Sequence, residues 1–191
     1  MRQEGHTLLE LIVALGILAV LAAIATPRLK AYSERARLEG AAREFQGRFR
    51  EARSIAVMRN VQTAMRFEVR DGAVFYSLFS DGNNNGVLSR DIKRGVDVRL
   101  RGPYLLNANV PGVRVAINPG VPEPPPGTGM LDTSDPVRFG RSEMLSFSPM
   151  GTATTGTFFL ATPSFQAAVR VVGTTARVRF LLYGGGKWLE P

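Results

Sequence analysis

The segment 81–92, DGNNNGVLSRDI, carries oxygen-bearing side chains at a spacing that suggests metal binding. Its first half matches the start of a calcium-binding loop, with oxygen donors at alternate positions and a glycine, Gly86, that permits the sharp turn. Its second half departs from that pattern, because Ile92 stands where the loop needs a bidentate glutamate. The candidate ligands are Asp81, Asn83, Asn85, the Val87 carbonyl and Asp91. The sequence favours the alternative, a polar loop whose residues tolerate left-handed backbone.

Basic residues near the C-terminus could contact phosphate groups. No Asp or Glu occurs between Glu143 and Glu190. The basic residues in that stretch are Arg170, Arg177, Arg179 and Lys187. Residues two apart on a strand point to the same face, so Arg177 and Arg179 would form a basic stripe suited to DNA backbone contact. An exposed polar strand face explains the same alternation, and the two interpretations remain open.

Enzyme chemistry finds little support in the composition. The chain has no cysteine and one histidine, His6, so thiol chemistry is excluded and His-based catalysis is absent from the rest of the chain. The segment 184–187, GGGK, is not a phosphate-binding loop, because Trp188 follows the lysine and no helix follows. The formal net charge of +8 allows an acidic partner such as nucleic acid or anionic lipid without requiring one. No cofactor is implied other than calcium at segment 81–92.

One acidic residue, Glu10, lies inside an otherwise apolar stretch from Leu8 to Ala25. The length of that stretch matches one helical crossing of a bilayer, and Pro27 follows it at the expected boundary, where we expect a kink. A carboxylate in hydrocarbon is costly unless paired, so Glu10 is a candidate functional residue. The alternatives are a Glu10 that reaches the headgroups and a secretory signal peptide cut after Ala25.

The N-terminal stretch GHTLLE, residues 5–10, resembles the leader of type IV pilins and type II secretion pseudopilins. The resemblance implies that a prepilin peptidase cuts after Gly5 and methylates the new N-terminus, His6. It also implies that Glu10 pairs with a neighbouring subunit's N-terminal ammonium during filament assembly. The family usually has Phe where this sequence has His6, so the departure falls on the residue to be methylated and leaves the cleavage position unchanged.

Two further segments resemble the H-type minor pseudopilins and FimT-like minor pilins. One is Ala52-Arg53-Ser54 followed by Arg59-Asn60, at the end of a helix, and the other is the block 147–158, FSPMGTATTGTF. The resemblance implies a minor pseudopilin of a type II secretion pseudopilus. FimT-like pilins instead bind DNA through Gly-Arg-x-Arg near the C-terminus, where this chain has Ala176 in place of the glycine. A secreted soluble domain released by signal peptidase is the third hypothesis.

The surrounding pattern predicts the elements that hold these residues. Apolar residues recur at helical spacing through Phe45, Phe49, Ala52 and Ile55 or Ala56, so a helix from about Thr7 to Met58 should carry one packing stripe. Alternation predicts strands, which we place at residues 63–69, 73–79, 145–147, 152–161, 167–172 and 176–183, with a turn at Asp71-Gly72. The segment 118–136 is rich in Pro and Gly and predicts a surface excursion with no packed element.

The sequence therefore predicts an α+β fold, in which a long helix packs on an antiparallel sheet as in pilins. We expect a leader at 1–5, a transmembrane helix at 6–26, the periplasmic half of the helix at 27–59 and one β-rich domain at 60–191. The expected location is the bacterial inner membrane, with a single pass and a periplasmic domain. The expected partners are other pseudopilins or minor pilins, which bind through the helix, and prepilin peptidase. DNA is the less favoured partner.

Overall fold

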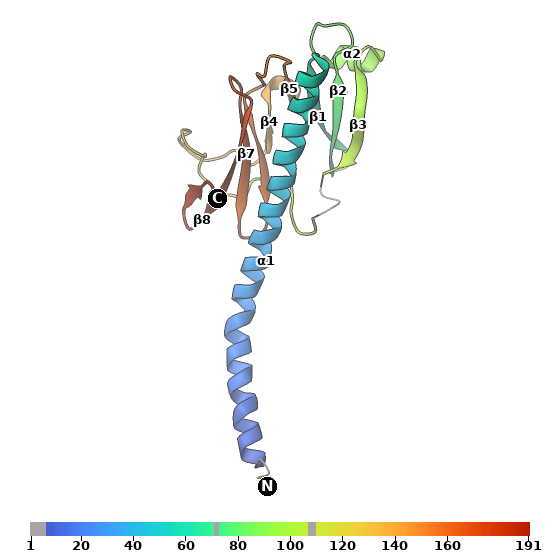
Figure 1. Ribbon diagram of the computed structural model, residues 1–191. Helices are drawn as coiled ribbons and strands as arrows, with labels where there is room; N and C mark the ends of the chain where they lie inside the picture. Colours follow the sequence, from blue (N-terminus) through green and yellow to red (C-terminus); the bar gives the residue numbers. More distant parts are fainter. Residues whose placement is uncertain (1–6, 71–72, 107–109) are drawn as a thin grey trace.

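A computed structural model describes residues 7–70, 73–106 and 110–191. A single long helix, α1 (Leu8–Arg59), runs from the N-terminal end into a β-rich body (Figure 1). The Thr7 side chain caps its start, and Asn60 ends it in the left-handed conformation, with its backbone N–H on the carbonyls of Ala56 and Val57. Asparagine tolerates that conformation better than most residues, which explains the Arg59-Asn60 pair at this helix end.

The two halves of α1 have different surroundings. Among the described residues, α1 is the one helix long and apolar enough to cross a membrane. Its N-terminal half projects away from the body, and its C-terminal half lies against the strands (Figure 1). The buried residues of the helix are Glu34, Leu38, Ala41, Ala42, Phe45, Phe49, Ala52 and Ala56. The helix continues through Pro27 without a break, and a kink there stays a prediction.

The first sheet has four antiparallel strands in the order β3-β2-β1-β5. They are β1 (Thr63–Arg70), β2 (Ala73–Ser80), β3 (Val98–Leu105) and β5 (Met144–Phe147). The short helix α2 (Ser89–Arg94) lies between β2 and β3 in the chain. The β1–β2 hairpin pairs in register from Thr63 with Ser80 to Arg70 with Ala73. Its expected turn, Asp71-Gly72, lies outside the described residues.

The second sheet has five antiparallel strands in the order β4-β6-β7-β8-β9. They are β4 (Val137–Arg138), β6 (Gly156–Ala161), β7 (Gln166–Val172), β8 (Arg177–Gly184) and β9 (Lys187–Leu189). The short 3₁₀ helix η1 (Gly140–Ser142) joins the two sheets between β4 and β5. The predicted α+β fold, a long helix on antiparallel β-structure, is confirmed, and the β-structure is divided into two sheets. The strand expected from residue 152 begins at Gly156.

The main core lies where α1 meets both sheets. Phe45 and Phe49 of α1 pack against Phe158 of β6, with ring centroids 4.8 and 6.3 Å apart respectively. Phe67 of β1 stacks on Phe158 at 5.4 Å, so the first sheet joins the same aromatic cluster. Two hydrogen bonds also tie α1 to the sheets. The Thr63 hydroxyl donates to the Ala52 carbonyl at 3.0 Å, and the Gln46 amide donates to the Val178 carbonyl at 3.1 Å.

The Pro-rich segment 118–136 contains no helix or strand, as predicted, but it packs on the second sheet instead of lying free on the surface. Val121 and Leu131 are buried, and their backbones pair through a 2.9 Å hydrogen bond from Leu131 N–H to the Val121 carbonyl. Together with Ile117 they form a second apolar cluster on the second sheet, which includes Phe159. These few apolar side chains, separated by turns that contain proline, cover one face of the second sheet. Their spacing follows neither a helical nor a strand period, so the sequence pattern did not predict the packing. The segment is part of the domain, as expected.

Candidate functional site

The start of α1 places Glu10 in a capping arrangement. The Thr7 hydroxyl oxygen accepts the backbone N–H of Glu10 at 3.3 Å. Thr7 and Glu10 have the Thr-x-x-Glu spacing of a capping box, and a carboxylate in the first turn also interacts favourably with the helix dipole. The sequence carried this signal, but the prediction for Glu10 considered only filament assembly and headgroup contact. Gly5 and His6, the predicted cleavage and methylation residues, lie outside the described residues.

The N-terminal half of α1 presents aliphatic side chains in every direction. The large apolar residues from Leu8 to Ile24 are each 53–75% exposed. A helix that is hydrophobic on all sides is stable only inside lipid or among other helices. This half of α1 therefore needs a membrane or a bundle of similar helices around it.

The polar loop at 81–97 is held together by its own carboxylates. Asp81 accepts the N–H groups of Asn83 at 3.0 Å and Gly86 at 2.7 Å. Asp97, which the sequence analysis missed, accepts those of Gly82 at 3.1 Å and Leu88 at 2.8 Å. Asp97 lies outside the twelve-residue calcium pattern, so little in the sequence marked it as part of this loop. These bonds connect the ends of the loop to its middle.

The remaining predicted calcium ligands have separate contacts. The Asn85 amide donates to an Asp91 oxygen at 3.0 Å, and Arg90 lies 3.7 Å from the other oxygen of the same carboxylate. The Val87 side chain is buried with Phe79 and Met144 beneath the loop. In the described part of the chain, no three acidic or histidine side chains converge as a metal site. Calcium binding at Asp81, Asn83, Asn85, Val87 and Asp91 stays a prediction.

The C-terminal arginines lie on the second sheet with different surroundings. Exposure alternates along β8, with Arg177 and Arg179 exposed and Val178 buried between them. Arg170 is opposite Arg179 on β7, but it donates to the Pro124 carbonyl at 3.2 Å and to that of Pro125. Burial lowers the pKa of Arg170 from its ordinary value, and the charge of Arg179 lowers it further against the opposing effect of Glu123. Arg170 therefore anchors the Pro-rich segment.

Of the three predicted phosphate contacts, Lys187 lies on the face of the sheet opposite to Arg177 and Arg179. Arg179 lies 3.6 Å from a Glu190 oxygen. This carboxylate partly neutralises the positive charge that Arg179 would present to a ligand. Lys187 pairs with Gly184, which lies an odd number of residues from Arg177 and Arg179. Since successive residues of a strand alternate between faces, the register places Lys187 on the opposite side of the sheet. The structure thus brings Arg177 and Arg179 together but not Lys187.

Ala176 occupies the position at which the Gly-Arg-x-Arg pattern has its glycine. It has φ of 47°, in the left-handed region that glycine adopts without strain. Its methyl group is nonetheless buried against the main core. The residue before β8 is therefore an alanine in the backbone conformation that a glycine favours. Arg177 and Arg179 lie on β8 although that glycine is replaced.

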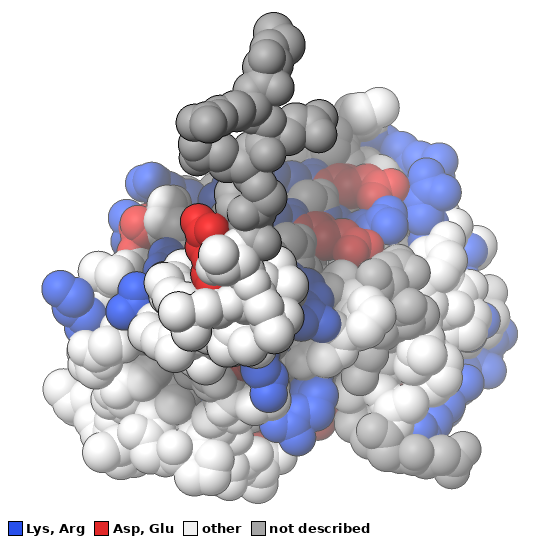
Figure 2. Space-filling view, turned by 90° about the horizontal axis from the view of Figure 1, so that it is seen from below, with Lys and Arg blue, Asp and Glu red and all other residues white. Residues whose placement is uncertain are grey.

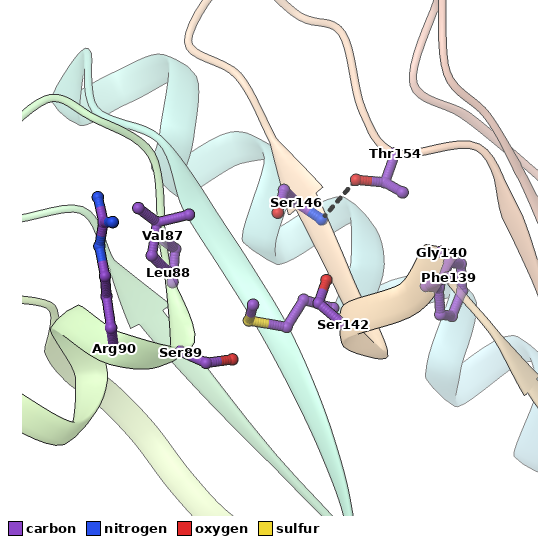
Figure 3. A pocket seen from close by; sticks show the side chains of 10 residues that line it. Val87, Leu88, Ser89, Arg90, Phe139, Gly140, Ser142, Ser146 and Thr154 are labelled. Carbon is purple, nitrogen blue, oxygen red and sulfur yellow. Dashed lines mark hydrogen bonds between the residues drawn. The ribbon is translucent and has the colours of Figure 1, made fainter.

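A groove with a volume of about 470 Å³ lies between the polar loop and the strand β5 (Figure 3). Loop residues 87–90 form one wall, and Phe139, Gly140, Ser142 and Met144 form much of the other. Inside it the Ser146 N–H donates to the Thr154 hydroxyl at 3.3 Å. Among the described side chains that line the groove, Arg90 is the one that is titratable.

The chain matches two protein-family models. Residues 1–26 match the prokaryotic N-terminal methylation motif, and residues 41–176 match type II transport protein GspH. The first match includes Gly5, His6 and Glu10. The second runs from the packing half of α1 to the turn before β8, so it covers the first sheet and the strands β4, β6 and β7 of the second. No curated protein and no solved structure matches the chain.

Proposed function

Because the chain belongs to the GspH family of type II transport proteins, we propose that it is a minor pseudopilin, a structural subunit of a type II secretion pseudopilus. In this role it would help to move folded proteins across the outer membrane. Members of this family are structural subunits rather than enzymes, in agreement with the expectation for this chain. The N-terminal methylation motif and the apolar helix are consistent with a single-pass inner-membrane protein. We place the β-rich domain in the periplasm.

The division of α1 is the observation that supports this proposal most directly. One half is buried against both sheets, and the other is exposed and apolar on all sides. Such a helix can lie in lipid before assembly and then exchange lipid for neighbouring helices in a filament. The rigid connection through one continuous helix would transmit the position of the helix bundle to the domain.

The leader and Glu10 give the assembly step its chemistry. Cleavage after Gly5 would leave an ammonium group at His6, a few residues before Glu10. A carboxylate near hydrocarbon is stabilised by a cationic partner, so the Glu10 of one subunit would attract the N-terminus of the next. This pairing would select the axial position of each incoming helix.

The experiment that tests secretion is deletion of the chain in its natural host, with export and DNA uptake measured side by side. We expect folded enzymes to accumulate in the periplasm while transformation frequency is unchanged, and the full-length chain should restore export. Normal export together with lost transformation would contradict the proposal and support the second candidate.

The second candidate is a minor pilin that binds DNA for natural transformation. Two observations favour it: Arg177 and Arg179 are exposed on one face of β8, and Ala176 keeps the turn that precedes them. The ion pair with Glu190 and the use of Arg170 as an internal anchor leave few free cations on that face. We therefore rank it below secretion.

A further inference from the structure

A small pocket lies at the end of the β-rich domain from which the exposed half of α1 emerges. Its volume is about 300 Å³, and its lining residues are Glu34, Arg37, Gly112, Arg114, Thr162 and Pro163. Glu34 is the first buried residue of α1 in chain order, so the pocket marks the junction between the exposed and the packed half. Figure 2 looks onto this end of the molecule, where basic side chains lie on several sides of the helix.

The carboxylate of Glu34 is buried without a donor for one of its oxygens. Glu34 is 8% exposed, and its Oε2 atom has no hydrogen-bond partner. Arg37 does not supply one, because its guanidinium donates to the Ser33 hydroxyl at 3.1 Å and to the carbonyls of Ser33 at 3.3 Å and Pro111 at 3.5 Å. A buried carboxylate is costly unless N–H donors or positive charge lie nearby, and the pocket that Glu34 lines has room for a group that brings both.

The rim of the pocket has the opposite charge. Arg114 is exposed there, and its backbone is fixed by two hydrogen bonds of 2.8 Å with Ala161. Arg37 also lines the pocket, so two arginines and one buried carboxylate share it. A lone cation approaching Glu34 would be repelled by both arginines, whereas a zwitterion with an inner ammonium and an outer phosphate complements all three charges.

The pocket lies close to the end of the expected transmembrane segment. Glu34 follows Thr26 by eight residues, which is about 12 Å of helix. Tyr32, between them, is 72% exposed, and tyrosines are enriched at the headgroup level of bilayers. The pocket would therefore face the outer part of the headgroup layer when α1 is in the membrane.

We propose that this pocket binds the phosphoethanolamine headgroup of a membrane lipid. The ammonium interacts with the carboxylate of Glu34, which lines the pocket, and the phosphate accepts from Arg37 and Arg114. Such a contact would hold the domain against the membrane until the subunit enters a filament. The proposal needs only the membrane anchor and is independent of whether the filament serves secretion or DNA uptake.

Native mass spectrometry of the delipidated full-length chain tests the proposal, with phosphatidylethanolamine and phosphatidylcholine added in equal amounts. The choline headgroup keeps the positive charge but has no N–H donor. We expect the chain to retain phosphatidylethanolamine about tenfold more than phosphatidylcholine, since a hydrogen bond to a charged group is made with only one of them. Glu34→Gln should bring this ratio close to one.

Matched variants separate the headgroup site from general effects. Glu39→Gln removes a partly exposed carboxylate on the same helix, paired with Arg35 at 2.9 Å, and should keep the preference. Arg114→Gln, at an exposed position, should weaken retention of both lipids. Soluble glycerophosphoethanolamine should displace the lipid, which would show that the headgroup alone is recognised.

Three results would overturn the proposal. The first is equal retention of the two lipids, and the second is a preference for phosphatidylethanolamine that survives Glu34→Gln. The third is protection of the pocket residues from solvent only when chains self-associate. The last result would assign Glu34 to a side chain of a neighbouring subunit. None of them bears on export in the deletion experiment, so this proposal and the secretion proposal can fail separately.

Discussion

Gly5 and His6 are the residues at which the proposed processing can be measured directly. Mass spectrometry of the mature chain should place its N-terminus at His6, with methylation as a mass increase on that residue. Gly5→Ala should leave the precursor uncut in the membrane, because the family's peptidase requires the glycine. An N-terminus at Thr26 would instead identify signal-peptide cleavage after Ala25 and would contradict the pilin-type anchor.

Glu10 occupies a position at which two physical demands coincide. Its spacing from Thr7 fits a capping box, and its charge fits a partner ammonium in the filament. Glutamine serves the capping box as well as glutamate does, but it has no charge. The pair Glu10→Gln and Glu10→Val therefore separates the two roles.

We expect Glu10→Gln and Glu10→Val to lower incorporation into filaments to a similar extent, because both remove the charge. The measurement is the amount of the chain that copurifies with sheared filaments, relative to the amount in the membrane. Val should also insert into membranes at least as well as the native residue, since a carboxylate is removed from hydrocarbon. Normal incorporation of the Gln variant would show that Glu10 acts only as a helix cap.

At the scale of elements, the packing of α1 against both sheets depends on Phe49. This residue is fully buried and contacts Phe158 of β6 and Phe139 beside η1, with ring centroids 6.3 and 5.9 Å away. Phe49→Ala should lower the free energy of unfolding by about 3–5 kcal/mol, through lost burial and a cavity at the junction of three elements. Met58→Ala, at an 80% exposed position on the same helix, should change it by less than about 0.5 kcal/mol.

Chemical denaturation with the tryptophan signal of Trp188 on the second sheet would measure this difference. The single tryptophan contacts Tyr183 and donates to the Pro122 carbonyl at 2.9 Å, so its emission reports on the sheet and the Pro-rich segment together. A loss confined to the helix, with an unchanged transition at Trp188, would mean that α1 and the sheets do not unfold as one unit.

The polar loop tests whether carboxylates at 81 and 91 serve a metal or the loop itself. Asp81 accepts two backbone N–H groups, so Asp81→Ala should destabilise the domain by about 2–3 kcal/mol even without calcium. If the loop also binds calcium, millimolar Ca²⁺ should raise the melting temperature of the native chain and not that of Asp81→Ala. An unchanged melting temperature with Ca²⁺, compared with Mg²⁺ as the control ion, would leave the loop with a structural role alone.

Local sequence patterns predicted α1 and most of the strands, whereas features that depend on contacts between distant parts of the chain were not predicted. The ends of α1 were predicted to within one residue, because the apolar stretch and the apolar stripe that follows it have a clear helical pattern. The caps at Thr7 and Asn60 are local signals that were not used. Strand β3 was not predicted, since Gly102-Pro103 interrupts its alternation. Gly102 is needed there because a side chain at that position would meet the Tyr76 carbonyl at 2.7 Å, where the β2–β3 register shifts.

The candidate site followed the same rule. The alternation of Arg177 and Arg179 was readable in sequence, and the structure shows both exposed on one face. The register that separates Lys187 from them depends on the β8–β9 pairing, and the capture of Arg170 by Pro124 depends on a contact 46 residues away in sequence. The orphaned oxygen of Glu34 had no sequence signal, because burial of a helical carboxylate depends on the domain that covers it.

At the scale of the whole molecule, a continuous helix of 52 residues joins an apolar anchor to a domain with two sheets. At about 1.5 Å per residue the helix is about 78 Å long, and roughly half of that length lies outside the domain. Charge is distributed in keeping with this division. The apolar anchor carries Glu10 alone between Leu8 and Ala25, and the basic excess of the chain lies beyond it.

The same basic excess makes DNA binding the property to measure on the whole chain. If Arg177 and Arg179 contact phosphates, the detergent-solubilised full-length chain should bind duplex DNA without sequence preference, weakly, and less as salt rises, because counterion release supplies the affinity. Arg177→Gln with Arg179→Gln should reduce the slope of log affinity against log salt by about one unit per lost contact and leave the fold intact.

Arg35→Gln with Arg50→Gln on α1 is the matched control, since it removes the same net charge from another surface. Equal losses in the two double variants would indicate attraction by net charge alone, and no binding at low salt would remove the DNA candidate and leave the secretion proposal as the better account of this molecule.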